Sequence, residues 1–149
     1  MPQLYDVLQN KMKNLTTIVF ALLFVVASSF AEEGKALPDF SKAFAEEKLW
    51  SQTQMEEIET YSYATDRSFK ELKKRFTKYL GESWKELKID EDVEAEINKS
   101  MAENDMQLSG NIIYTNDSFP DVQVGLTQME MDFMGKSYLV NVTVMKNAK

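Results

Sequence analysis

An uninterrupted apolar run stands near the start of the chain, ahead of a body in which apolar and polar residues alternate. The run, residues 14–31, reads NLTTIVFALLFVVASSFA, with Lys11 and Lys13 before it and two glutamates after it. A basic flank, an apolar stretch and small residues at the exit are typical of a secretory signal peptide. Ser29 and Ala31 suit the cleavage site. We therefore expect export to the periplasm or the medium, with cleavage after Ala31.

Two alternatives to a cleaved leader of residues 1–31 remain open from the sequence. Eighteen residues is the lower limit of a membrane-spanning helix, so the run can also act as a retained signal anchor. Its small and polar C-terminal end favours cleavage. Met12 begins a shorter basic leader and is an alternative initiator, in which case the assigned start is wrong. The chain contains no cysteine, so a lipoprotein anchor is not expected.

The body of the chain has the patterns of a single α+β domain. Residues 57–64 (EIETYSYA) alternate as a strand does. A capping box at Ser68–Glu71 opens a helix with apolar residues at helical spacing, and Gly81 is its expected C-cap. A second helix is predicted from Asp90 to about Glu103, with acids at its N-terminus. Three strands are predicted after it.

These elements predict a four-stranded antiparallel sheet with one or two helices packed on one face. Their order is strand, helix, optional helix, strand, strand, strand. Residues 32–54 are expected to form an N-terminal arm or a short helix capped by Asp39. Residues 55–149 are expected to form the single α+β domain.

One feature of the last strands bears on their register. Apolar residues occupy even positions up to Leu126 and odd positions from Met129. A strand with one buried face cannot change phase in this way unless an extra residue is inserted. The pattern therefore predicts a β-bulge at Thr127–Gln128, in a hairpin that pairs Met129 with Val142.

Composition limits the chemistry that this domain can perform. Seventeen Lys and Arg against 24 Asp and Glu give a net charge of −7, which makes nucleic acid an improbable partner. With no Cys and no His, thiolate zinc sites, Cys nucleophiles and His-dependent triads are excluded. The acidic run 90–96 lacks the glycine of a calcium loop. We therefore predict no catalytic, cofactor-binding or metal-binding residues and no cofactor. A carboxylate-dependent hydrolase is the less favoured alternative.

Two groups of side chains are candidates for contact with a partner. Tyr61 and Tyr63 qualify if their face of the sheet is open, because tyrosine joins a large apolar ring to a polar hydroxyl. Lys70, Lys74 and Lys78 recur every fourth residue along the predicted basic helix. The acidic segment that follows this helix is expected to balance its charge, which favours an ordinary solvated surface.

The leading hypothesis is an exported, small, non-catalytic binding or accessory protein of the cell envelope. Its partner is an unidentified protein or envelope component, and the sequence does not indicate its oligomeric state. The alternative is a peripheral membrane or anionic-polymer binder that uses the basic helix 67–78. Membrane contact is the less favoured of the two.

Overall fold

The structure is a computed structural model that describes residues 36–133 and 135–146. The predicted leader, residues 1–31, lies outside the described residues. The elements in chain order are the 3₁₀ helix η1 (Phe40–Lys42), strands β1 (Lys48–Met55) and β2 (Ile58–Thr65), helix α2 (Phe69–Leu80), strand β3 (Trp84–Leu87), helix α3 (Glu91–Glu103), and strands β4 (Leu108–Asn116), β5 (Val122–Phe133) and β6 (Lys136–Lys146).

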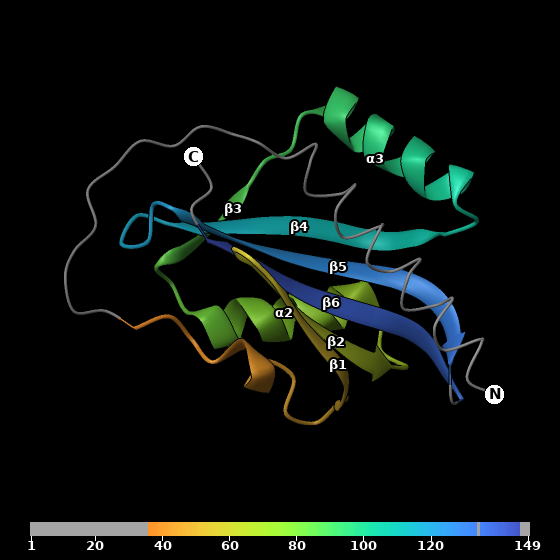
Figure 1. The fold of residues 1–149 in the computed structure, drawn as a ribbon, viewed down its shortest axis with the longest axis horizontal. Coiled ribbons are helices and arrows are strands. Elements are labelled where there is room, and N and C mark those ends of the chain that lie inside the picture. Colours follow the sequence, from red (N-terminus) through yellow and green to blue (C-terminus); the bar gives the residue numbers. More distant parts are fainter. Residues whose placement is uncertain (1–35, 134, 147–149) are drawn as a thin grey trace.

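The strands form one six-stranded antiparallel sheet in the order β1-β2-β6-β5-β4-β3 (Figure 1). The prediction of a four-stranded sheet with its helices on one face is therefore wrong. The two strands that were not predicted, β1 and β3, form the two edges of the sheet. An edge strand buries little side-chain surface, so the apolar alternation of β1 is weak, and β3 has only four residues. Within the predicted arm 32–54, the described part forms η1 and most of β1.

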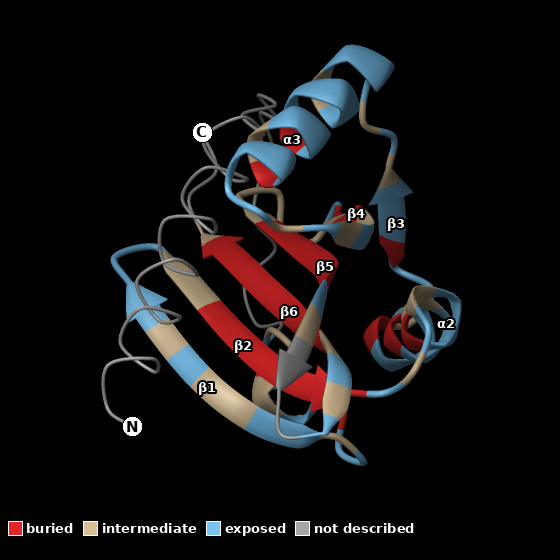
Figure 2. Ribbon diagram, turned by 90° about the vertical axis from the view of Figure 1, so that its right-hand side faces the viewer, coloured by how far each residue is buried: buried red, intermediate tan, exposed pale blue. Residues whose placement is uncertain are grey.

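The two helices lie on opposite faces of the sheet (Figure 2). On one face, α2 packs Leu72, Phe76 and Leu80 against alternate residues of the central strands, among them Val124 and Val142. Burying each large apolar side chain contributes about 2 kcal/mol, so this core is the main source of stability. The segment around η1 covers the same face next to α2, where Phe40 and Phe44 are buried.

On the other face, α3 forms a second core. Ile97 and Met101 of α3 pack against Ile113, Met129 and Leu139 of the sheet. The remaining face of α3 is exposed, and most of the charged residues of that helix lie there. The sheet is therefore the middle layer of three, with the basic helix α2 on one face and the acidic helix α3 on the other. The domain does not have the two layers that we predicted.

The β5–β6 hairpin keeps a regular register through the segment where we predicted a bulge. Residues 127 and 128 pair without interruption, and Met129 lies opposite Leu139 rather than Val142. The register changes only after Glu130. The predicted bulge at Thr127–Gln128 is therefore wrong.

The cause of this error is the second core. Leu126 faces α2, and Met129 faces α3, so each apolar set on β5 has its own helix to pack against. A strand that is buried on both faces carries apolar residues at both parities and needs no extra residue. The phase change in the sequence marks the crossing from one core to the other.

The local signals for the helices are confirmed. Ser68 caps α2, its hydroxyl accepting from the N–H of Glu71 while the Glu71 carboxylate accepts from the N–H of Ser68. Gly81 ends the helix at φ 87°, a conformation that favours glycine. The second predicted helix is α3, which begins after Asp90.

Candidate functional site

The two tyrosines proposed for partner contact lie inside the core that α2 covers. Both side chains are buried, and the Tyr63 hydroxyl donates to the carbonyl of Phe40 at 2.6 Å. The Tyr61 hydroxyl donates to Glu59 at 3.1 Å. Burial raises the pKa of Tyr61 to about 12 and also raises the pKa of Tyr63. Their proposed binding role required an open face of the sheet. Both tyrosines lie instead on the face that α2 covers.

The three lysines proposed from their spacing lie together on the solvent-facing side of α2. Lys70, Lys74 and Lys78 are all exposed, and their spacing places them in one row opposite the buried side of the helix. Successive lysines in the row are separated by a rise of about 6 Å along the helix. None of the three forms an ion pair with another described residue. We call this row the basic stripe.

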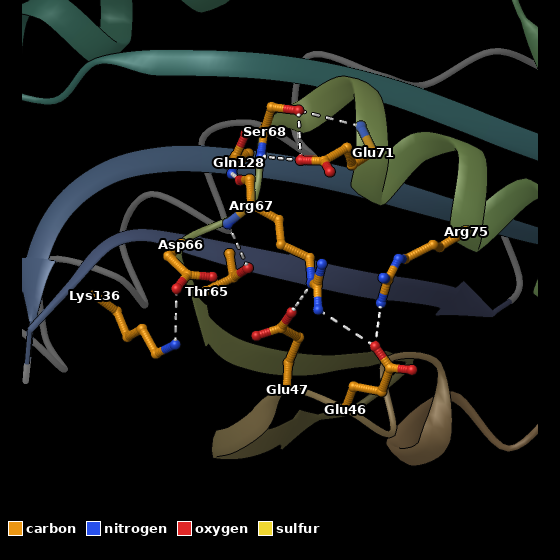
Figure 3. Close-up of polar contacts among 10 residues, drawn as sticks. All are labelled: Glu46, Glu47, Thr65, Asp66, Arg67, Ser68, Glu71, Arg75, Gln128 and Lys136. Atoms are coloured by element: carbon orange, nitrogen blue, oxygen red, sulfur yellow. Dashed lines mark hydrogen bonds and ion pairs between the residues drawn. The ribbon is translucent and has the colours of Figure 1, made fainter.

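The two arginines of this region are neutralised by the segment that precedes β1 (Figure 3). Arg67 donates to Glu47 at 2.6 Å and to Glu46 at 3.3 Å, and Arg75 donates to Glu46 at 2.6 Å. The Glu47 side chain is only 5% exposed. A short, sheltered pair of this kind fixes geometry more than an exposed pair does. These contacts hold the segment against the start of α2.

Two lysines close to the stripe are also paired. Lys73 lies 3.0 Å from Glu86 of β3, and Lys85 lies 2.8 Å from Asp117. These partners come from β3 and from the loop after β4, not from α3. Pairing therefore neutralises two of the five basic residues of α2, Lys73 and Arg75, and leaves the basic stripe as the unpaired cations of the helix.

The acidic segment does not balance the stripe as we expected from the sequence. Helix α2 carries five basic residues and one acidic residue, a net of +4, and α3 carries five acidic residues and one basic residue, a net of −4. The two helices lie on opposite faces of the sheet, and no ion pair joins them in the described part of the chain. The unpaired lysines of α2 therefore form a positive side of the domain, and the acids of α3 form a negative side.

An open groove of about 630 Å³ lies beside the stripe, between the η1 segment and α2. Its lining combines Phe44 and Tyr79 with three basic residues and two acidic ones, which are Lys42, Arg75, Lys78, Glu46 and Glu47. Phe44 is fixed there by stacking on Phe76, at a centroid distance of 5.7 Å. The groove therefore adds a shallow, partly apolar surface next to the basic stripe.

The carboxyl groups near these cations are poorly suited to acid catalysis. Hydrogen bonds hold the pKa values of several carboxyl groups below their usual range; these are Asp39 (from Ser41), Glu46 (from Arg75), Glu59 (from Lys146), Asp66 (from Lys136) and Glu71 (from the Ser68 backbone). A general acid needs a raised pKa instead. No group of three or more acidic side chains that could hold a metal ion occurs in residues 36–133 and 135–146.

Comparisons with known proteins give no relative: no family model, no curated protein sequence and no solved structure matches this chain. Among the described helices, none is long and apolar enough to cross a membrane.

The sequence located the basic stripe but missed what surrounds it. The spacing of the lysines was sufficient to predict that they share one side of a helix. Glu46, Glu47 and Phe44 were not predicted as parts of the site, because nothing in their local pattern indicates which helix they contact. The separation of positive and negative charge was also missed, because it depends on α3 crossing to the other face.

Proposed function

We propose that this protein is an exported, non-catalytic accessory protein of the cell envelope that docks on anionic phospholipid headgroups through the basic stripe of α2. The supporting observation is that Lys70, Lys74 and Lys78 form an unpaired row while the neighbouring arginines and Lys73 are neutralised within the domain. Export is supported by the sequence of the leader alone.

The shape of the stripe favours a flat array of anions over a single bound anion. The three lysines are spaced every fourth residue along the exposed side of a helix, an arrangement that does not surround one point. Each lysine near an anionic lipid surface contributes about 1 kcal/mol, so the stripe contributes about 3 kcal/mol in total. The apolar side of α2 is buried in the core, so docking is electrostatic and α2 does not insert among the acyl chains.

The distribution of charge supports docking despite the net charge of −7. When α2 faces a membrane, the acids of α3 lie on the far face of the sheet. The Debye length is about 10 Å at 0.1 M salt, so the repulsion between those acids and the membrane is strongly screened. The separated charges also orient the protein as it approaches.

Vesicle sedimentation tests this proposal. The protein is incubated with vesicles of equal parts phosphatidylglycerol and phosphatidylcholine, and with vesicles of phosphatidylcholine alone. We expect binding to the anionic vesicles only, and loss of that binding when salt is raised from about 20 mM to about 0.5 M. Absence of binding at low salt would refute lipid docking. Binding to a soluble polyanion such as dextran sulfate but not to vesicles would also refute it and would favour a polymer partner.

A matched pair of variants assigns the binding to the stripe. Lys74→Gln with Lys78→Gln removes two charges from the stripe, and Lys88→Gln with Lys99→Gln removes two exposed lysine charges elsewhere. We expect the first variant to weaken vesicle binding roughly 30-fold, which corresponds to about 2 kcal/mol. The second should bind like the wild type. Equal weakening by both variants would contradict docking through α2.

A further inference from the structure

The groove between the η1 segment and α2 has walls that are fixed to each other. The Tyr79 hydroxyl of α2 donates to the carbonyl of Asp39 at 2.6 Å. Arg75, also of α2, donates to Glu46 at 2.6 Å (Figure 3). A cavity whose walls are joined before a ligand arrives loses little conformational freedom on binding. The groove is therefore preformed, and its volume of about 630 Å³ lies in the range of small-molecule sites.

The apolar part of the groove comes from both walls. Ala43, Phe44 and Ala45 line it from the η1 segment, and Tyr79 lines it from α2. The Phe44 ring is held in place by its stacking on Phe76. The Tyr79 side chain is 37% exposed, which makes it one of three large apolar residues that are exposed in the described part of the chain. A ligand with an apolar body gains affinity by covering this surface.

The charged residues of the lining differ in whether they have a partner. Glu46 and Glu47 accept from the arginines described above, and Lys42 lies 3.1 Å from Asp39. Lys78 is exposed and forms no ion pair with another described residue. A bound anion therefore meets carboxylates that are already neutralised and one cation that is not. A bound cation finds no carboxylate of the lining without a partner.

We propose that this groove binds a free fatty-acid anion, with its carboxylate at Lys78 and its alkyl chain along Phe44, Ala45 and the Tyr79 ring. The single negative charge of the ligand matches the single unpaired cation of the lining. The unbranched chain suits an open groove, whose apolar lining it can follow along its length. Contact with both parts of the lining distinguishes this ligand from a small inorganic anion and from a neutral apolar molecule.

The groove and the basic stripe share Lys78 but bind in different ways. The stripe docks on a surface that carries many anions, whereas the groove takes one molecule from solution. Fatty-acid binding therefore goes beyond the proposed docking and does not rest on it. It is tested without vesicles, so either proposal can fail while the other holds.

Isothermal titration calorimetry on the full chain tests the site with amphiphiles kept below their micelle-forming concentrations. Dodecanoate is the probe, and dodecyltrimethylammonium carries a chain of the same length with a positive head group. We expect dodecanoate to bind at least tenfold more tightly than the cation, because only the anion balances Lys78. Octanoate should bind more weakly than dodecanoate, since each fully buried methylene contributes roughly fourfold in affinity. Absence of dodecanoate binding, or equal binding of both head groups, would overturn the proposal.

A pair of lysine variants separates the groove from the stripe. Lys78→Gln and Lys70→Gln each remove one charge from the stripe, but only Lys78 lines the groove. We expect Lys78→Gln to weaken dodecanoate binding about fivefold, as for a solvent-exposed ion pair, and Lys70→Gln to leave it unchanged. Both variants should weaken docking on anionic vesicles alike. Equal effects of the two variants on dodecanoate binding would contradict a carboxylate at Lys78.

Filling the groove tests where the alkyl chain lies. Ala45 is exposed, so Ala45→Trp places a large ring in the groove without disturbing the core. Ala95→Trp, its control, adds the same ring at an exposed position of α3, on the other side of the sheet. We expect Ala45→Trp to weaken dodecanoate binding at least tenfold while retaining vesicle docking, and Ala95→Trp to bind dodecanoate like the wild type. Binding that is insensitive to Ala45→Trp would place the fatty acid elsewhere and refute the assignment.

Discussion

An engineered disulfide tests the register of β5 and β6, and with it the two-sided core. Glu130 and Tyr138 lie directly opposite each other in this hairpin. Because the N–H of Lys146 bonds to Glu57 of β2, the even-numbered residues of β6 bond to β2 and not to β5. Glu130 and Tyr138 therefore form a non-hydrogen-bonded pair, whose Cα atoms are about 4.5 Å apart, a distance that a disulfide spans.

The stability gain from this disulfide follows from the loop that it closes. The chain has no native cysteine, so Glu130→Cys with Tyr138→Cys creates one unambiguous thiol pair. Closing the nine-residue segment 130–138 stabilises the fold by about 2.5 kcal/mol in the chain-entropy model. Neither side chain is buried, so little of this gain should be offset by lost packing. Urea unfolding with and without reductant measures the gain.

The control distinguishes the observed register from the bulged one. With a bulge at residues 127–128, position 130 would face Asn141, whereas here Glu130 and Asn141 are offset by three positions, about 10 Å, on opposite faces. We expect complete thiol loss on oxidation for the 130/138 variant and free thiols for Glu130→Cys with Asn141→Cys. The reverse pattern would refute the register and the assignment of Leu126 and Met129 to separate cores.

Three further predictions concern stability. Ser68→Ala removes the α2 capping box and should lower the free energy of unfolding by about 1 kcal/mol in urea titrations; an unchanged midpoint would contradict the cap. Gly110→Ala places a methyl group where the Phe69 ring lies, and should cost about 1–3 kcal/mol that Phe69→Ala partly relieves, measured as coupling in a double-mutant cycle. The hydrogen bond from Lys146 holds the pKa of Glu59 below its usual 4.5, so this contribution to stability is present above about pH 4.5 and is lost as pH falls through the folded-state pKa. Glu59→Gln should therefore flatten the acid side of the stability–pH profile, and an unaltered profile would contradict this role.

Local signals were sufficient to predict the elements that bury one clear face. The capping box at Ser68, the apolar spacing of α2 and Gly81 fixed both ends of that helix, because caps act within one turn. The alternation in residues 57–64 was sufficient for β2. By contrast, β1 has mixed burial along its length, and Trp84 carries the apolar signal of β3 almost alone.

Long-range arrangement could not be predicted from these patterns. The apolar residues of β5 were assigned to one face because nothing local shows that α3 covers the other. The unpredicted position of α3 also affected the candidate site. The spacing of Lys70, Lys74 and Lys78 predicted a stripe, but whether acidic residues of α3 pair with these lysines depends on where α3 packs. Tyr61 and Tyr63 were treated as surface candidates because alternation alone does not show which face of a strand is covered.

Lysine footprinting on the wild-type protein tests docking through α2 most directly. The protein is acetylated briefly with and without vesicles containing phosphatidylglycerol, and each modified lysine is quantified by mass spectrometry. We predict that Lys70, Lys74 and Lys78 become protected when these vesicles are present, while Lys88 and Lys99 react at the same rate in both samples. Protection of Lys88 and Lys99 with no protection of the stripe would contradict the proposed orientation, and unchanged reactivity of all five would contradict docking itself.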